Sequence, residues 1–298
     1  MTKLVELLIN GVSLGFIYSL IALGFVIIYK STEVVNFAHG SLLLLGGYVT
    51  ARLVGRFGFS LAFLVGLLIT AVVALIIERL LIRPLRRRGA DVSAPAILTI
   101  GVDILVSTDL ARRIGANTFG LHDPWGSSVV HLGGFTVAQA RIAAIVVAVV
   151  LIALFLLAFK FTSWGIAMRA SAEDGEAAAL MGIRLGRVSA TAWVIGGLLA
   201  AIAAIFLTAF PTPGLDRTTG LSALSAFPAA ILGGLDSTGG VLLGGLVVGV
   251  AQTLTSGYEN AVPFLGQGLG SIMPWIVMLL VLLIRPAGLF GTTEATRV

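Results

Sequence analysis

Eight or nine apolar segments follow one another along the chain, separated by short polar stretches. A helix needs about 20 residues to cross the hydrocarbon core of a bilayer, and most of these segments reach that length. They cover residues 7–29, 34–54, 60–82, 94–114, 139–160, 188–210, 222–234, 240–256 and 271–285. The pattern predicts an all-α fold, a polytopic transmembrane helical bundle formed by a single domain over residues 1–298.

Two of these segments are shorter than the rest. Segment 271–285 is of marginal length, and segment 222–234 is too short to span a bilayer alone. Non-helical backbone and partial helices are tolerated at membrane depth only where protein buries them. We therefore expect 222–234 to be a half-helix or a re-entrant element, and its length leaves open whether it crosses.

Composition agrees with a membrane protein. The chain is 58% hydrophobic and 11% charged, whereas about a quarter of the residues of a soluble globular protein are charged. The net charge of +5 comes from basic residues at segment ends, and no nucleic-acid-reading motif is present. The absence of cysteine excludes disulfides and thiolate chemistry.

Basic residues also predict an orientation, because cytoplasmic loops of membrane proteins are enriched in Lys and Arg. The densest cluster consists of Arg79, Arg83, Arg86, Arg87 and Arg88. Placing this cluster in the cytoplasm puts the N-terminus and loop 115–138 outside and loop 161–187 inside. The scheme has exceptions, since it places Arg112, Arg113 and Arg141 outside, but these are a minority of the basic residues.

Motifs of catalysis and cofactor binding are incomplete. The stretch GVSLG at 11–15 resembles a nucleophile elbow but lies inside an apolar helix. Residues 24–31 approach a phosphate-binding loop but place Tyr29 where the second glycine is required. His122, Asp123 and His131 match no metal-ligand spacing. We predict no enzymatic activity, no metal and no cofactor, and any ATP used must be hydrolysed by another subunit.

Small residues recur one helical turn apart. Such small-xxx-small patterns let helix backbones approach closely in membranes. Gly11 and Gly15 form one pair. Gly240 with Gly244, and Gly245 with Gly249, form two more pairs whose faces lie about 100° apart on one helix. We predict helix packing at all six glycines.

Two carboxylates, Asp103 and Asp109, lie inside the apolar segment 94–114. Carboxylates within a span are rare and often functional. Their spacing places them on different helix faces. Two interpretations stay open: they line a translocation path, or one of them pairs with Arg112 or Arg113 near the outer end.

The stretch RASAEDGEAAALMGI at 169–183 is polar and alanine-rich between two apolar segments. We expect a short helix with its acidic residues early and Gly182 at its end. Ala177, Ala178, Leu180 and Met181 would form a small apolar ridge for the groove of a partner protein. The alternative is a solvated loop, and the alanine content with a glycine stop favours docking.

Three stretches together carry a family resemblance. They are SLIALGFVIIYKSTEVVNFAHGSLLLLGGY at 19–48, GIAMRASAEDGEAAALMGIRLGRV at 165–188 and FPAAILGGLDSTGGVLLGGLVVGV at 227–250. The chain resembles, nearly end to end, the LivH-type permeases of bacterial ABC importers for branched-chain amino acids, within the branched-chain amino acid/ribose type of importer.

The resemblance implies roles for two groups of residues. Loop 161–187 would carry the helix that couples the permease to its ATPase, with contacts from Arg169, Ala172, Glu173, Asp174, Ala177, Ala178, Leu180, Met181 and Gly182. The NFAHG motif would break the helix near the translocation path, which would include Asn36, Phe37, His39 and Gly40. Asp103 and Asp109 are candidate path residues on a separate ground, their place inside an apolar segment. A structural turn at the wall of the path is favoured for Asn36 and His39 over direct substrate contact.

The resemblance also implies partners and a location. These are a homologous second permease (LivM-like), two ATPase subunits (LivG/LivF-like) that bind ATP and magnesium, and a periplasmic or lipid-anchored binding protein, all at the bacterial inner membrane. The acidic residues of 94–114 depart from the family pattern. They leave urea, short-chain amides or another amino acid open as substrates. A stand-alone secondary transporter or channel is a further alternative.

Overall fold

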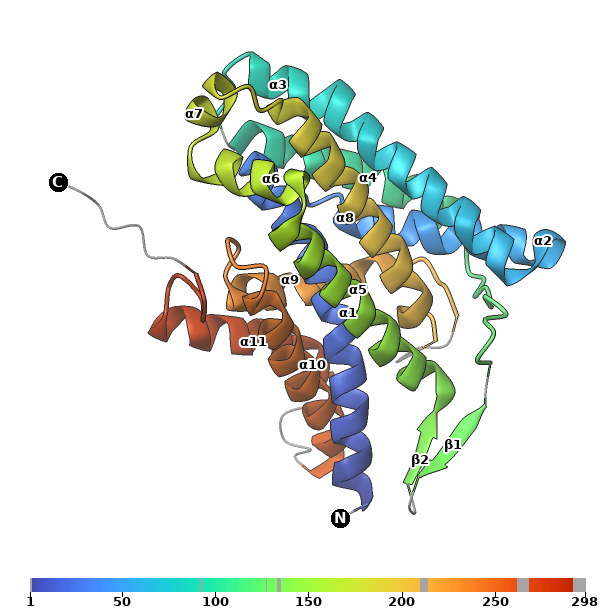
Figure 1. Ribbon diagram of the computed structural model, residues 1–298. Coiled ribbons are helices and arrows are strands. Elements are labelled where there is room, and N and C mark those ends of the chain that lie inside the picture. Colours follow the sequence, from blue (N-terminus) through green and yellow to red (C-terminus); the bar gives the residue numbers. More distant parts are fainter. Residues whose placement is uncertain are drawn as a thin grey trace.

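The computed structural model describes residues 2–91, 93–126, 128–132, 135–209, 214–261 and 268–291, and shows a bundle of helices (Figure 1). Six helical stretches of the described chain are long and apolar enough to cross a membrane. The α-helices are α1 (Thr2–Thr32), α2 (His39–Ile76), α3 (Arg83–Arg87), α4 (Ser93–Ile114), α5 (Gln139–Phe161), α6 (Ser163–Glu173), α7 (Gly175–Leu180), α8 (Leu185–Leu207), α9 (Ser222–Gly233), α10 (Gly240–Tyr258) and α11 (Leu269–Ile284). The prediction of a polytopic helical bundle is confirmed.

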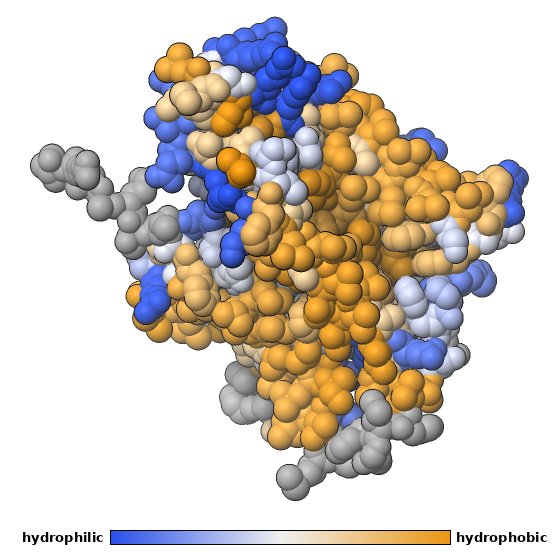
Figure 2. All heavy atoms as spheres, viewed as in Figure 1, coloured by the Kyte–Doolittle hydropathy of each residue, from blue (hydrophilic) through white to orange (hydrophobic). Residues whose placement is uncertain are grey.

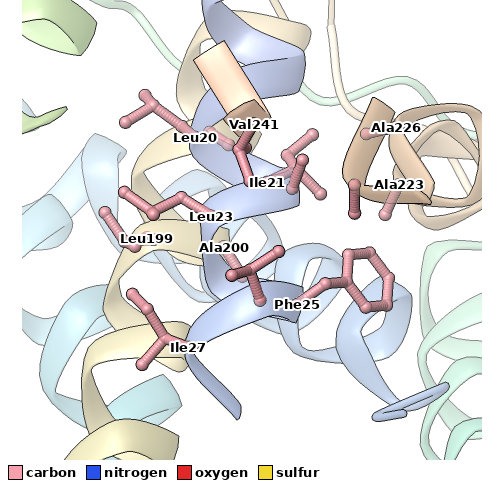
Figure 3. Packing of buried hydrophobic residues seen from close by; sticks show 14 of the residues in the cluster. Leu20, Ile21, Leu23, Phe25, Ile27, Leu199, Ala200, Ala223, Ala226 and Val241 are labelled. Carbon is pink, nitrogen blue, oxygen red and sulfur yellow. The ribbon is translucent and has the colours of Figure 1, made fainter. Parts of the chain in front are cut away.

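Helix α1 is the central element of the core. It is apolar on every side, the pattern expected of a helix surrounded by protein. Its residues Leu20 to Ile28 are almost completely buried. Leu199 and Ala200 of α8, Ala223 and Ala226 of α9, and Val241 of α10 belong to the same cluster (Figure 3). Helices α4 and α5, by contrast, leave apolar side chains such as Leu105 and Leu154 exposed, as lipid-facing helices do.

Helix α2 folds back on itself at Gly58. The backbone there has φ 73° and ψ 168°, a conformation outside the helical region that glycine adopts at little cost. The two arms then pack together: a Cβ atom on Gly46 would lie 3.0 Å from Oγ1 of Thr70, and one on Gly66 would lie 2.9 Å from the carbonyl oxygen of Gly46. The predicted segments 34–54 and 60–82 therefore correspond to two arms joined by a tight turn. A short π-helix, η1 (Ile77–Ile82), continues the second arm into α3.

The glycines of α10 contact α1, as the small-residue pattern predicts. A Cβ atom on Gly11 would lie 2.8 Å from the Cα atom of Val250, and one on Gly15 would lie 2.8 Å from that of Leu246. Cβ atoms on Gly245 and Gly249 would clash with the backbone of α1. The backbones meet here with no room for side chains, and the close contact offsets the low helix propensity of glycine.

The second glycine face of α10 packs against α9. Cβ atoms on Gly240 and Gly244 would clash with the carbonyl oxygens of Gly233 and Ala229, respectively. Both predicted faces are therefore occupied by helices of the same chain.

Helix α9 confirms the expectation of a partial helix at 222–234. Its 12 residues measure about 18 Å at 1.5 Å per residue, which is too short to cross a bilayer. It is preceded by a single 3₁₀ turn, η2 (Thr219–Leu221), and most of its residues are buried. A second 3₁₀ turn, η3 (Glu259–Ala261), follows α10.

A two-stranded hairpin was not predicted. Strands β1 (Val129–Leu132) and β2 (Phe135–Ala138) pair antiparallel, with Val130 opposite Val137. The sequence contains the signal, since two runs rich in β-branched and aromatic residues flank a Gly-Gly pair. The description of 115–138 as a loop was incomplete for this reason.

The two ends of the bundle differ in the way that the orientation scheme requires. Helices α3, α6 and α7 lie together at one end, and the N-terminus and the β hairpin lie at the other (Figure 1). The arginine cluster and loop 161–187 therefore share a side.

Cysteine labelling tests which side is cytoplasmic. Single cysteines at Arg87, Ala172 and Ser128 would stand at exposed positions in a chain without native cysteine. We expect an impermeant thiol reagent to label intact cells only at position 128, with positions 87 and 172 labelled after permeabilisation. Labelling of position 87 in intact cells would contradict the orientation.

Candidate functional site

The NFAHG motif forms a break between two helices inside the bundle. Helix α1 ends at Thr32 and α2 begins at His39. Within the break, Oδ1 of Asn36 accepts a hydrogen bond from the Ala38 amide at 3.1 Å, and the Asn36 carbonyl accepts one from the His39 amide at 3.2 Å. Asn36 thus builds a turn through its own side chain, as the structural-turn interpretation expects.

Helix α4 satisfies further backbone groups of the break. Thr99 Oγ1 accepts a hydrogen bond from the Phe37 amide at 3.1 Å, and Asp103 Oδ1 accepts one from the Ser41 amide at 3.0 Å. Thr99 and Asp103 lie one turn apart and so on one face of α4. Ser41 is in the first turn of α2, where amides have no partner within the helix and a negative charge is favourable. Asp103 therefore caps α2 from a neighbouring helix.

Aromatic rings surround the break. His39 and Asn36 are completely buried. The His39 ring lies 4.5 Å from that of Phe25, and Phe25 lies 5.4 Å from Phe227 of α9. Phe37 also contacts Phe227, with ring centroids 6.0 Å apart. The motif is therefore packed against α9 as well as α4.

Two interrupted helices meet at Gly40. A Cβ atom on Gly40 would lie 2.8 Å from the carbonyl oxygen of Gly220, and one on Gly220 would lie 3.1 Å from that of Gly40. The start of α2 and the turn that precedes α9 are thereby in backbone contact. Interrupted helices that meet inside a bundle are typical of membrane transporters.

Asp109 has a different environment from Asp103. Its carboxylate accepts hydrogen bonds from Arg112 at 2.8 Å and from Arg113 at 2.6 Å, and all three side chains are substantially exposed. The pairing interpretation is confirmed for Asp109. Asp103 contacts neither arginine, and its role as a helix cap was not anticipated.

The segment 163–183 forms two short helices rather than one. Thr162 Oγ1 caps α6 by accepting a hydrogen bond from the Gly165 amide at 3.1 Å, and Asp174 Oδ1 caps α7 by accepting one from the Ala177 amide at 2.9 Å. The prediction of a single helix was wrong, because an aspartate that caps a new helix start interrupts the old one. Gly182 has φ 86° directly after α7, so it ends the helix as predicted.

The apolar ridge of α7 is narrower than predicted. Leu180 is 89% exposed and Met181 is 84% exposed, and Ala177 is exposed beside them. Ala178 is buried against the bundle, which removes it from the predicted docking surface. Among the acidic and small residues of the predicted set, Ala172, Glu173 and Asp174 are exposed.

Arg169 points back to its own chain. Its guanidinium donates hydrogen bonds to the carbonyl oxygens of Phe159 and Lys160, the latter at 3.3 Å, and lies over the ring of Phe159. These carbonyls belong to the last turn of α5, where a basic side chain satisfies unpaired oxygens. Arg169 therefore fixes α6 on α5.

A buried carboxylate joins this end of the bundle to α2. Glu78, in η1, is 1% exposed, and its two oxygens bind Arg83 Nε at 3.1 Å and Arg83 Nη2 at 3.2 Å. Ser189 Oγ of α8 donates to Oε1 of Glu78 at 3.0 Å, and Arg83 also donates to the Gly186 carbonyl. The cluster ties η1 to the first turns of α8, directly after α7.

The sequence did not predict this cluster. The prediction for Arg83 concerned only the orientation of the chain in the membrane, and Glu78 had no predicted role. The rule that singled out Asp103 and Asp109 applies equally to Glu78, which lies in the predicted apolar segment 60–82. The link to Ser189, 111 positions away, has no sequence signal.

Among the residues that the structure describes, no group of three or more His, Asp or Glu side chains is placed to hold a metal ion. The side chain of His131 lies outside the described part.

A bundle of membrane-length helices, with interrupted helices meeting at its centre, is the architecture of a polytopic membrane permease. The family model for the branched-chain amino acid transport system permease component matches residues 7–282, and the chain belongs to this family. No solved structure matches the chain.

Three relatives illustrate the similarity. The high-affinity branched-chain amino acid transport system permease protein LivH of Escherichia coli K12 is 30% identical over 97% of this chain and 96% of its own length. Its counterpart BraD of Pseudomonas aeruginosa is 30% identical over 98% and 97%, respectively. A probable branched-chain amino acid transport permease protein LivH of Methanocaldococcus jannaschii is 35% identical over 91% and 88%.

Proposed function

We propose that this chain is the membrane-spanning permease subunit of an ABC importer for leucine, isoleucine and valine. In this proposal the chain provides the translocation path for the substrate and does no covalent chemistry. It relies on partner subunits that bind and hydrolyse ATP. Its partners would be a second homologous permease, two ATPase subunits and a substrate-binding protein outside the membrane, in a bacterial inner membrane. Family membership and the functions for which the relatives are named support the substrate class.

The observation that carries the coupling part of the proposal is the exposure of Leu180 and Met181. Leu180 is the last residue of the short helix α7 and Met181 directly follows it, and α7 lies at the same end of the bundle as α3 (Figure 1). Adjacent apolar side chains on a helix are a recognisable anchor for a groove in a partner. A cleft of about 390 Å³ between α6 and the start of α8, lined in part by Trp164 and Ile183, adds a concave surface beside them.

Helix α7 also has a physical connection to the centre of the bundle. Helix α7 is followed within a few residues by α8, and the first turns of α8 bind the Glu78–Arg83 pair of η1. Helix α2 leads from η1 back to the NFAHG break. A displacement of α7 by an ATPase would therefore reach the interrupted helices through two packed elements.

The acidic residues of α4 support the substrate assignment once their contacts are known. Asp103 binds the amide of Ser41, and Asp109 is engaged by two arginines. Both carboxylates thus have roles inside the chain and need not recognise a cationic substrate. Urea, short-chain amides and other amino acids remain the alternative substrates, to be separated by the assay below.

Reconstitution of the complete importer tests the proposal. The chain is assembled in vesicles with the second permease, the ATPases and the binding protein, and uptake of radiolabelled leucine, urea and acetamide is measured with internal and external ATP. We expect ATP-dependent uptake of leucine that unlabelled isoleucine and valine inhibit. Uptake of urea or acetamide without leucine uptake would reassign the substrate, and ATP-independent uptake would support a secondary transporter or channel.

The double substitution Leu180→Ser/Met181→Ser tests the docking surface in the same system. Both side chains are exposed, so the fold is expected to persist, while loss of two central apolar anchors should reduce ATPase co-purification and leucine uptake at least tenfold. Val129→Ser, which removes an exposed apolar side chain at the opposite end, is the matched control and should have no effect. Wild-type recovery of the ATPase with the double variant would contradict docking through α7.

A further inference from the structure

Four arginines in and next to α3 form a charged surface that the proposed transport path does not use. Arg79, Arg86, Arg87 and Arg88, here called the arginine patch, are all exposed. In the described part of the chain, none of the four lies within ion-pair distance of a carboxylate. Glu78, which precedes Arg79, is paired with Arg83 instead. The patch therefore concentrates positive charge without an internal counter-charge.

A cleft lies within this surface. It has a volume of about 340 Å³ between α3 and the start of α8, and Arg83, Arg86 and Arg87 line it together with Gly186. The Glu78 carboxylate also reaches the cleft but is neutralised there by Arg83 and Ser189. Two arginines with unoccupied donors thus converge on one concave site, and guanidinium groups match the geometry of phosphate oxygens.

The position of the cleft relative to the apolar surface identifies the ligand. Close to the patch along the chain, the end of α2 exposes Ile76 and η1 exposes Leu80, which is 68% exposed. Figure 2 shows hydrophilic atoms over α3 at the top of the molecule, with hydrophobic surface directly below. A ligand that satisfies both surfaces has an anionic phosphate in the cleft and acyl chains along the second arm of α2.

We propose that the cleft between α3 and the start of α8 is a binding site for the headgroup of an anionic phospholipid. Arg86 and Arg87 would bind the phosphate, and Arg79 and Arg88 would add attraction at the membrane surface. Clusters of four or more basic residues next to a membrane helix recognise anionic lipids in this way. Because the site borders η1 and α8, a bound lipid would also stabilise the joint between them.

Lipid binding to the purified full chain tests the proposal. Native mass spectrometry compares retention of phosphatidylglycerol and phosphatidylcholine with identical acyl chains. We expect the wild type to retain more phosphatidylglycerol than phosphatidylcholine. In the triple variant Arg86→Gln/Arg87→Gln/Arg88→Gln, the ratio of the two should fall at least tenfold, since each basic residue near an anionic surface contributes about fivefold to binding. Arg112→Gln/Arg113→Gln, at the opposite end of the bundle, is the matched control and should keep it.

Two further measurements separate the possible outcomes. Raising sodium chloride from 50 to 500 mM should weaken the preference of the wild type for phosphatidylglycerol, because exposed charges are screened by salt. This measurement uses the wild type alone and needs no variant. Millimolar inorganic phosphate should not displace the lipid. Equal retention of both lipids by the wild type, full preference in the triple variant, or displacement by phosphate alone would each overturn the proposal. So would a triple variant that keeps its lipid preference but no longer binds the ATPase, which would make the patch a protein-docking surface.

Discussion

Gly249→Ala is expected to prevent stable packing of α10 on α1. A Cβ atom at this position would clash with the backbone of Gly15, and backbone atoms of a buried helix have nowhere to move. Overpacking of this kind costs about 1–3 kcal/mol even where side chains can adjust. The measurement is the temperature at which half of the detergent-purified protein leaves the monodisperse peak in size-exclusion chromatography, which should fall by several degrees or become unmeasurable.

Gly101→Ala is the matched control. Gly101 lies within α4, and a Cβ atom there would have nothing within 4 Å. Alanine is favoured over glycine in a helix by up to about 1 kcal/mol, so this variant should be equal to or more stable than the wild type. If Gly249→Ala behaves like Gly101→Ala, the close approach of α1 and α10 does not exist in the folded protein.

Arg83→Ala should be among the most damaging single substitutions at the α3 end of the bundle. It leaves the Glu78 carboxylate buried with Ser189 Oγ as its remaining side-chain donor. Removal of one partner of a buried ion pair costs about 3–5 kcal/mol, whereas replacement of both partners by apolar groups is often tolerated. We therefore expect the thermal midpoint of Arg83→Ala to fall markedly, and Glu78→Leu/Arg83→Met to recover most of the loss.

The exposed ion pair of α4 provides the comparison. Asp109→Asn removes a carboxylate that contacts two arginines, but all three side chains reach solvent. Exposed pairs contribute little to stability, so this variant should have a midpoint close to that of the wild type. Equal effects of Arg83→Ala and Asp109→Asn would show that burial of Glu78 does not determine the strength of its pair. If Glu78→Leu/Arg83→Met recovered stability but not leucine uptake, the Glu78–Arg83 pair would be needed for coupling as well as for folding.

Local and periodic features of the sequence predicted most of the fold. Runs of apolar residues identify membrane helices because a bilayer demands a fixed length of hydrocarbon-compatible chain. The glycine pairs of α10 and α1 predicted close packing because a one-turn repeat of small residues is itself a surface property of a helix. Gly182 predicted a helix end because a left-handed backbone favours glycine.

The site was predicted less completely, because its residues act through contacts across the fold. The sequence marked Asp103 and Asp109 as the same kind of residue, yet one caps α2 at Ser41 and the other pairs with neighbouring arginines on an exposed surface. It marked Ala178 and Leu180 as one ridge, but the bundle buries the first and exposes the second.

The sequence by itself therefore determined the type and approximate ends of the long apolar helices, since these depend on composition and spacing within one segment. Only the tertiary structure decided which polar groups find partners: Glu78 with Ser189, Thr99 with the NFAHG break, and Gly40 with Gly220. The physical reason is that helix formation is local, whereas satisfying a buried carboxylate or an interrupted helix end depends on which helices become neighbours in the folded bundle.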